Sequence, residues 1–124
     1  MTPTEIRAII QMAAQACTTG NAAAFASLFA KDGEILLPGQ VLAGRAAVEQ
    51  ATMAYLATLT AIEIEIASIV VEGDRAAVEW VWRATKATGE RQQSENAILL
   101  EFRRGLIVRW REYAGQSTAV AVPR

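Results

Sequence analysis

The chain has 124 residues, of which 52% are hydrophobic and 20% are charged, and its formal net charge is −1. This length and composition predict a single globular domain over residues 1–124. The near-neutral charge provides no basic stripe for nucleic acid, and no apolar run is long enough to cross a bilayer. The N-terminus lacks a positive segment followed by an apolar run, so we expect no signal peptide and, by default, a cytoplasmic protein.

The chain contains no histidine, and Cys17 is its single cysteine. An internal disulfide is therefore excluded, and no imidazole can activate Cys17 as a nucleophile. The same composition excludes Ser-His-Asp catalysis and metal sites built from histidine or several thiolates. We expect no metal and no cofactor, and we interpret Cys17 as a small buried hydrophobe.

The first third of the chain predicts two helices. Thr2 can cap the first helix, with Pro3 at its first position and Glu5 completing a capping box. Gly20 ends this helix, and Asn21 can cap a short second helix. The apolar face of that second helix is predicted to be Phe25, Leu28 and Phe29, and the Asp32-Gly33 pair ends it.

Two short strands are predicted next, over residues 34–37 and 41–43, around a Pro38-Gly39 turn. A third helix is expected over residues 46–59. From residue 61 the period of the apolar residues changes from helical to alternating, which predicts long strands. The first of four long strands begins at residue 61, and the other three cover residues 75–85, 94–102 and 106–113. A polar loop is expected over residues 86–93. The tail, residues 115–124, is expected to be a frayed end or an added edge strand.

The alternation of apolar and charged residues assigns the side chains of the four long strands to two faces of the sheet. The predicted inner face carries Ile62, Ile64, Ile66, Val78, Trp80, Trp82, Ile98, Leu100, Phe102, Val108 and Trp110. The predicted outer face carries Glu63, Glu65, Glu79, Arg83, Glu95, Glu101, Arg109 and Arg111. A charged face of this kind is typical of a surface that meets solvent or a second subunit. A single bulge in a strand would exchange the inner and outer residues that follow it in that strand. Three helices followed by antiparallel strands predict an α+β fold with the helices on one face of the sheet.

Three polar residues fall on the apolar face, namely Ser94, Asn96 and Glu112. An acid that faces an apolar interior has its charged form disfavoured, which raises its pKa and suits a general acid or base. Glu112 is therefore the candidate catalytic residue, with Asn96 as its donor. The competing interpretation, which the position near a strand end favours, is a hydrated Glu112 paired with an arginine.

The aromatic residues of this face also have two interpretations. Trp80, Trp82 and Trp110 can fill a core, or they can line a cavity for a flat apolar ligand. Tyr55, on the third helix, can offer its hydroxyl to such a ligand or keep that hydroxyl in water.

Several short motifs, taken in order, resemble the nuclear transport factor two-like superfamily. They are Thr19-Gly20-Asn21 followed by residues 25–33, the run Leu42-Ala43-Gly44-Arg45-Ala46-Ala47-Val48, the hairpin Arg104-Gly105-Leu106-Ile107, and Trp110-Arg111-Glu112-Tyr113-Ala114-Gly115. The resemblance, to the SnoaL-like and ketosteroid isomerase-like branch, implies a cystatin-like cone with three N-terminal helices packed on a curved antiparallel sheet. It also implies an apolar pocket and a homodimer that pairs through the outer sheet face.

The catalytic residues of the superfamily's enzymes are missing at the matching positions. Ala13 stands where ketosteroid isomerase has a tyrosine, and Leu37 where it has its general-base aspartate. The stretch around Ile98 lacks the second aspartate. Gly115 replaces the last-strand aspartate that the cyclases and epoxide hydrolases use. Steroid-type isomerisation is therefore not expected, although Glu112 or Glu79 could substitute for a missing acid.

Three functions remain open at the level of the sequence. The first is binding of a small hydrophobic molecule in the pocket without a metal. The second is an isomerase, cyclase or hydratase in which Glu112 moves a proton. The third is a structural dimerisation module whose core is filled by side chains.

Overall fold

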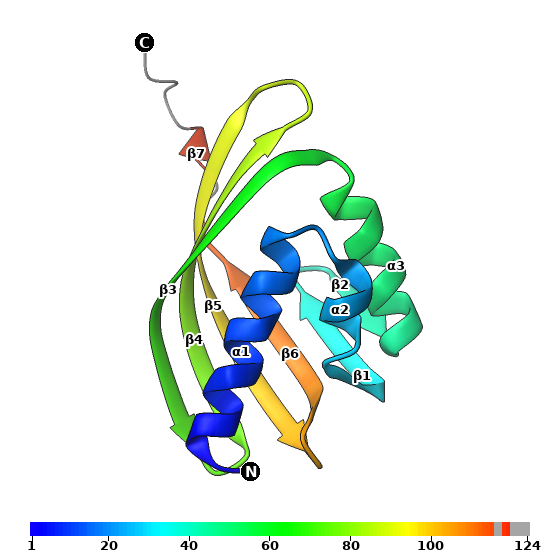
Figure 1. Ribbon diagram of the computed structural model, residues 1–124, viewed down its shortest axis with the longest axis vertical. Coiled ribbons are helices and arrows are strands. Elements are labelled where there is room, and N and C mark those ends of the chain that lie inside the picture. Colours follow the sequence, from blue (N-terminus) through cyan, green and yellow to red (C-terminus); the bar gives the residue numbers. More distant parts are fainter. Residues whose placement is uncertain (116–117, 120–124) are drawn as a thin grey trace.

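The computed structural model describes residues 1–115 and 118–119, which form three helices and one curved sheet (Figure 1). The helices are α1 (Pro3–Thr18), α2 (Ala22–Ala26) and α3 (Arg45–Leu56). The predicted capping box is present at the start of α1, where Thr2 and Glu5 bond each other's backbone N–H. Asn21 caps α2 through a bond from the backbone of Ala24. The local signals for both helix starts are therefore confirmed.

The strands form one sheet in the order β2-β1-β6-β5-β4-β3, with β7 paired to β5. Their bounds are β1 (Phe29–Leu37), β2 (Gln40–Ala43), β3 (Leu59–Glu72), β4 (Arg75–Lys86), β5 (Arg91–Arg103), β6 (Leu106–Ala114) and β7 (Thr118–Ala119). All neighbours run antiparallel except β1 and β6, which are parallel. The α+β class is confirmed, and this parallel pair modifies the all-antiparallel sheet expected from the resemblance.

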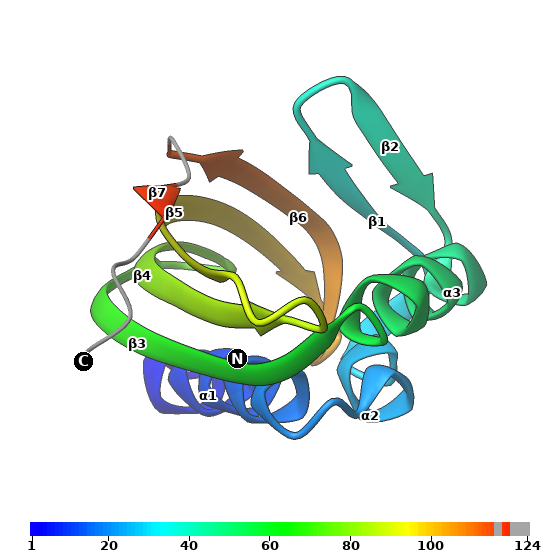
Figure 2. The ribbon, with the colours of Figure 1, turned by 90° about the horizontal axis from the view of Figure 1, so that it is seen from above.

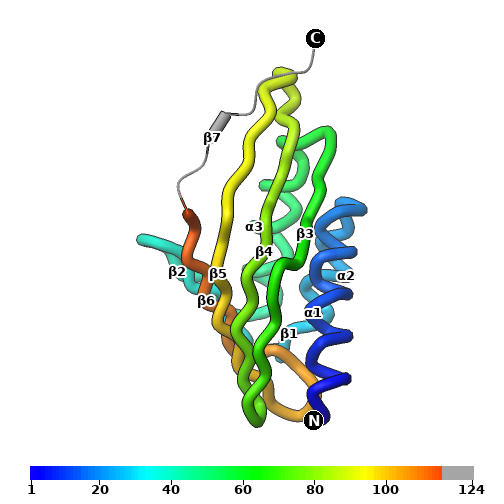
Figure 3. The backbone as a smooth tube through the Cα atoms, turned by 90° about the vertical axis from the view of Figure 1, so that its left-hand side faces the viewer, coloured from blue at the N-terminus to red at the C-terminus, as the bar shows by residue number. Residues whose placement is uncertain are grey.

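The sheet curls into an open cone. Seen from above, β3 to β6 follow an arc, with α1 against its lower side and α3 beside β1 and β2 (Figure 2). The side view shows the long strands in front, with the helices behind and beside them (Figure 3). The concave face of the sheet therefore meets the helices, and the convex face is left uncovered by them.

Several predicted boundaries shift because strand pairing overrides the local pattern. Phe29, predicted on the second helix, is the first residue of β1 and pairs with Ile107 of β6. The third helix ends at Leu56, and β3 already begins at Leu59. Most of the predicted polar loop is strand, because β4 continues to Lys86 and β5 starts at Arg91. Of the predicted tail, residues 118–119 add to the sheet beside β5, and residues 116–117 and 120–124 lie outside the described residues.

Two bulges change the predicted faces. In β3, Ala67 is skipped between the Ile66–Trp80 and Ser68–Glu79 pairs, so that Ile69 and Val71 pack against the core beyond it. In β6, Val108 is skipped between the Glu101–Arg109 and Phe102–Ile107 pairs.

The assignment of Val108 to the inner face is therefore wrong. Ile107 is fully buried there in its place and meets Phe29, while Val108 is only partly buried. A single extra residue in one strand reverses which side chains point inward, and the sequence pattern alone does not reveal it.

The rest of the predicted inner face lies on the concave side. Val78, Trp80, Ile98, Leu100, Phe102 and Trp110 are buried, and Ile64, Ile66 and Trp82 pack partly buried against them. From α1 and α2 this layer receives Ile6, Ile10, Ala13, Cys17 and Phe25. Burial of this apolar face supplies the main stabilisation of the fold, at roughly 25 cal/mol per Å² removed from water.

The convex face is charged, as predicted. Arg83 forms a long salt bridge of 4.0 Å with Glu65 across β3 and β4. The same face also exposes large apolar side chains at Val70, Leu99 and Tyr113. The expected homodimer through this face stays a prediction. No helix formed by the described residues has the length and apolar character needed to cross a membrane.

The bulge in β6 gives a matched pair of substitutions. We expect Ile107→Ala to lower the free energy of unfolding by about 2–5 kcal/mol, because it leaves a cavity in the core. Val108→Ala should cost about 1 kcal/mol or less, since part of that side chain is already in water. Urea unfolding followed by tryptophan fluorescence measures both. Equal losses, or a larger loss for Val108→Ala, would contradict the register.

Candidate functional site

A cavity of about 810 Å³ opens into the wide end of the cone. Its lining comes from α1, α2 and α3 and from β1, β2, β4, β5 and β6, so elements from the whole chain meet there. The curvature of the sheet creates this space, because strands that curl away from α3 cannot be packed by it along their full width. A volume of this size matches that of small-molecule sites in proteins.

The predicted site residues all line this cavity, whereas Glu79, named as a possible substitute acid, is exposed on β4 and does not line it. The site residues are Tyr55 from α3, Trp80 and Trp82 from β4, Asn96 from β5, and Trp110 and Glu112 from β6. They come together because Trp80 pairs directly with Asn96, and Trp82 with Ser94, on the concave face. Whether each of them binds a ligand stays a prediction.

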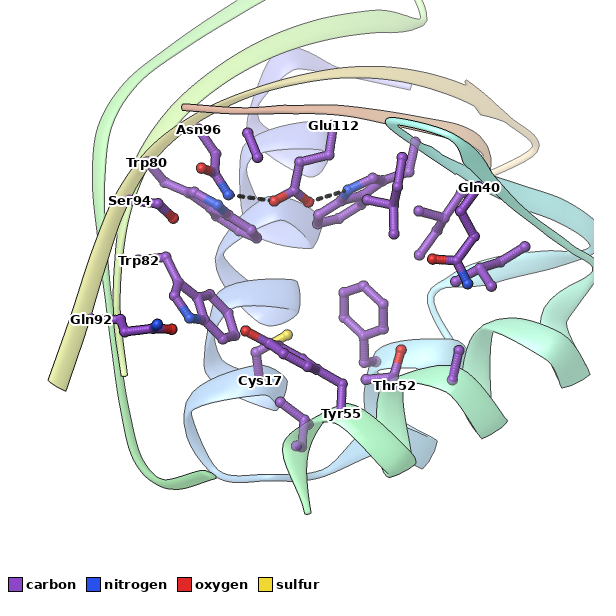
Figure 4. A pocket seen from close by; sticks show the side chains of 18 of the residues that line it. Cys17, Gln40, Thr52, Tyr55, Trp80, Trp82, Gln92, Ser94, Asn96 and Glu112 are labelled. Carbon is purple, nitrogen blue, oxygen red and sulfur yellow. Dashed lines mark hydrogen bonds between the residues drawn. The ribbon is translucent and has the colours of Figure 1, made fainter. Parts of the chain in front are cut away.

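Glu112 is held inside the cone by two neutral donors (Figure 4). The side-chain amide of Asn96 donates to Oε2 at 2.6 Å, and the indole N–H of Trp110 donates to Oε1 at 2.9 Å. Trp110 lies two residues before Glu112 on the same face of β6, and Ile98 is the residue opposite Glu112 on β5. Both hydrogen-bond partners of Glu112 are neutral, and Arg111 and Arg109 alternate onto the other face. The arginine partner of the competing interpretation is therefore not found among the described residues.

Burial raises the pKa of Glu112, while the hydrogen bonds from Trp110 and Asn96 lower it in part. The net direction is upward because neither donor carries a charge that would stabilise the carboxylate. Among the described residues, the cavity lining contains no lysine or arginine, and Glu112 is its single carboxyl group. Glu112 therefore has no counter-ion among these lining residues.

Two buried polar atoms of residues that line the cavity have no hydrogen-bond partner within the described structure: Trp80 Nε1 and Asn96 Oδ1. Each is closed off from solvent, which costs about 1–3 kcal/mol for an unsatisfied group. A half-turn of the Asn96 amide would present Oδ1 to Glu112, and a protonated Glu112 could then donate to it. The Asn96–Glu112 pair can therefore accommodate either protonation state of the carboxyl group.

The helices contribute two further titratable groups to the cavity. Tyr55 of α3 lies over Trp82, with ring centroids 6.0 Å apart, and its side chain is half-exposed at the mouth of the cavity. Burial, with a contribution from the charge of Glu112, raises the pKa of Tyr55. Burial also raises the pKa of Cys17 to about 12, which keeps this thiol protonated and supports its interpretation as a small buried hydrophobe.

The sequence analysis missed several polar residues of the cavity. Gln92 and Gln93 line it, although they were predicted in a loop, because β5 begins earlier than expected. Thr52 of α3 and Gln40 of β2 also face the cavity (Figure 4). The helical position of Thr52, one turn before Tyr55, is the signal that could have identified it.

The positions where the resemblance led us to expect catalytic residues do not all lie at the cavity. Leu37 and Gly115 line the cavity, whereas Ala13 is fully buried in the core. At Gly115 the backbone N–H donates to the carbonyl of Glu95 at 2.9 Å, and a Cβ added to Gly115 would overlap that oxygen. A side chain at this position cannot be added without a shift of the backbone of Gly115 or Glu95. Within the described residues, no group of three or more acidic or cysteine side chains could hold a metal ion.

A profile of the SnoaL-like domain matches residues 9–110, which is most of the chain. The chain belongs to this family. The predicted relationship to the nuclear transport factor two-like superfamily is thereby confirmed, and the cone with its helices on the concave side is the fold of the SnoaL-like domain. No curated protein is similar enough to count as a match.

Solved structures agree on the fold of this SnoaL-like domain. One is a hypothetical protein with a ketosteroid isomerase-like fold from Catenulispora acidiphila, in complex with trimethylamine. It is 24% identical, with a TM-score of 0.79, over 91% of this chain and 86% of that one. Another, from Jannaschia, is a proposed SnoaL-like polyketide cyclase, 11% identical with a TM-score of 0.80 over 92% and 89%. A third is a protein of unknown function from Burkholderia xenovorans, 19% identical with a TM-score of 0.75 over 97% and 88%.

The close approach at Gly115 predicts the effect of restoring a side chain there. We expect Gly115→Ala to destabilise the SnoaL-like domain by about 1–3 kcal/mol, because the methyl group overlaps the Glu95 carbonyl. Ala114→Ser, at the adjacent exposed position, should change stability little. Thermal unfolding of the two variants against the parent measures this difference. A Gly115→Ala variant as stable as the parent would refute the close packing.

Proposed function

We propose that this SnoaL-like protein binds a small hydrophobic molecule in the cavity between α3 and the curved sheet. The observation that carries the proposal is an interior space of about 810 Å³ bordered by all three tryptophans of the chain. Apolar walls with a few converging polar groups are the usual composition of a small-molecule site. Here the polar groups of the lining include Tyr55, Asn96 and Glu112, which come from three different elements.

The open volume of the cavity also argues against the alternative of a structural dimerisation module whose core is filled by side chains. A module with only a dimerisation role would have these tryptophans packed by side chains from the helices. Trp80 and Trp110 do contact each other, at 5.5 Å between ring centroids, and Phe25 packs at 5.3 Å from Trp110. Trp82 and Tyr55 extend beyond this cluster and border open space instead. This arrangement favours ligand binding over a filled core.

Adjacent residues on α3 offer a test with a matched control. Thr52 lines the cavity, whereas Met53 is exposed and does not. We expect neutral compounds of one to three fused rings to give a saturable change in tryptophan fluorescence with the parent protein and with Met53→Phe. Thr52→Phe should weaken binding about tenfold or more, because its ring occupies the cavity. The absence of saturable binding across such a panel, or equal affinity in Thr52→Phe, would refute the proposal.

A second candidate function is proton transfer by Glu112 in an isomerase, cyclase or hydratase. The observation in its favour is the buried carboxyl group, whose pKa is raised and which faces the open cavity. A general acid or base is most effective when its pKa is near the working pH. If a ligand of the cavity is turned over, Glu112→Gln should abolish turnover and retain binding. Turnover that survives in this variant would assign the chemistry to another group.

A further inference from the structure

The carboxyl group of Glu112 lacks the positive charge that a buried carboxylate normally has nearby. Its two hydrogen bonds come from Asn96 and Trp110, which are neutral donors. The part of the chain that the structure describes contributes no lysine or arginine to the cavity lining, and the sequence contains no histidine. An ionised side chain in an apolar setting is strongly disfavoured unless an opposite charge is close. A positively charged ligand would supply it.

The walls around this carboxyl group suit the same kind of ligand. The three tryptophans, Tyr55 and Phe25 all line the cavity. Their rings are close to one another, with centroids 5.5 Å apart for Trp80 and Trp110, and 6.0 Å apart for Tyr55 and Trp82. Tryptophan and tyrosine faces carry partial negative charge and attract cations, most strongly where water is excluded.

These two observations belong to one site because Glu112 lies among the rings. Trp110 contacts its carboxylate directly, and Trp80 lies opposite Asn96, its other partner. Figure 4 shows the carboxylate directed into the space that Trp82 and Tyr55 border from the other side. A group that enters through the mouth beside Tyr55 would pass aromatic rings before it reached the carboxylate.

We propose that the ligand of this cavity is an organic ammonium ion with an apolar body, whose nitrogen lies against Glu112 among the aromatic rings. The inference rests on the proposed function and specifies its ligand class. The apolar body would pack against Ile35 and Leu37 of β1 and Leu42 of β2, which line the cavity. The alternative is a neutral alcohol, which would donate a hydrogen bond to Glu112 without bringing a charge.

A pair of compounds of nearly the same shape separates these ligand classes. Adamantylmethylammonium and adamantylmethanol differ in the ammonium or hydroxyl group, and neither absorbs light where tryptophan does. Tryptophan fluorescence reports on the site, since all three tryptophans line it. We expect the ammonium compound to bind about tenfold more tightly than the alcohol to the parent protein.

Glu112→Gln should remove this preference while it retains binding of the alcohol. The glutamine can still accept from Trp110, and it can donate to Asn96 after the amide of Asn96 rotates. The matched control is Glu79→Gln, which removes an exposed carboxylate from the outer face of β4 and should leave the preference unchanged.

The pH dependence gives a second readout. Adamantylmethylammonium remains charged from about pH 4 to about pH 8, so that only the protein can titrate. The other titratable groups that face the cavity, Cys17 of α1 and Tyr55 of α3, stay neutral in this range because burial raises the pKa of both. Affinity for the ammonium compound should therefore fall as Glu112 becomes protonated at low pH, and affinity for the alcohol should not.

The outcomes are distinct for the two proposals. Equal or tighter binding of the alcohol by the parent protein would overturn the ammonium inference and leave the binding function in place. A preference that persists in Glu112→Gln would also overturn the inference. Failure of both compounds to bind would overturn the inference together with the proposed function.

Discussion

The placement of one carboxyl group among aromatic rings is the feature of the cavity on which the proposed binding function depends. Glu112 is placed inside the cone by the two-residue alternation of β6, which also directs Trp110 inward and Arg111 outward. The same strand therefore brings an acid into the apolar interior and keeps the nearest arginines on the opposite face. Hydrogen bonds from Asn96 and Trp110 offset part of the cost of that burial, and no lysine or arginine is among the described residues that line the cavity.

Much of this arrangement could be predicted from the sequence, because it follows from short-range rules. The capping residues Thr2 and Asn21 mark two helix starts, and alternation assigns Trp80, Asn96 and Glu112 to the concave face. The bulges at Ala67 and Val108 could not be predicted, since an extra residue leaves no local signature in an apolar run. The environment of Glu112 depends on which side chains from distant strands surround it, and its position near a strand end suggested a hydrated group instead.

Gly115, where the resemblance led us to expect an acid, and Glu112 lie close together at the same end of the sheet. The backbone of Gly115 bonds directly to Glu95, so closely that no side chain fits. The sheet remains closed at this point, and the carboxyl group that faces the cavity lies three residues earlier in β6. The fold is that of the SnoaL-like family, and among the described residues of the cavity lining Glu112 is the single acid.

A direct measurement of the Glu112 titration tests this account at its centre. Carbon-13 chemical shifts of the side-chain carboxyl groups, assigned by comparison with Glu112→Gln, give the pKa of each glutamate, and the indole N–H resonance of Trp110 should titrate together with Glu112. We predict that the pKa of Glu112 lies above the ordinary range for glutamate, because burial without a counter-ion disfavours the charged form. A pKa at or below that range, or an indole resonance of Trp110 that does not follow it, would contradict the placement of this group in the apolar interior.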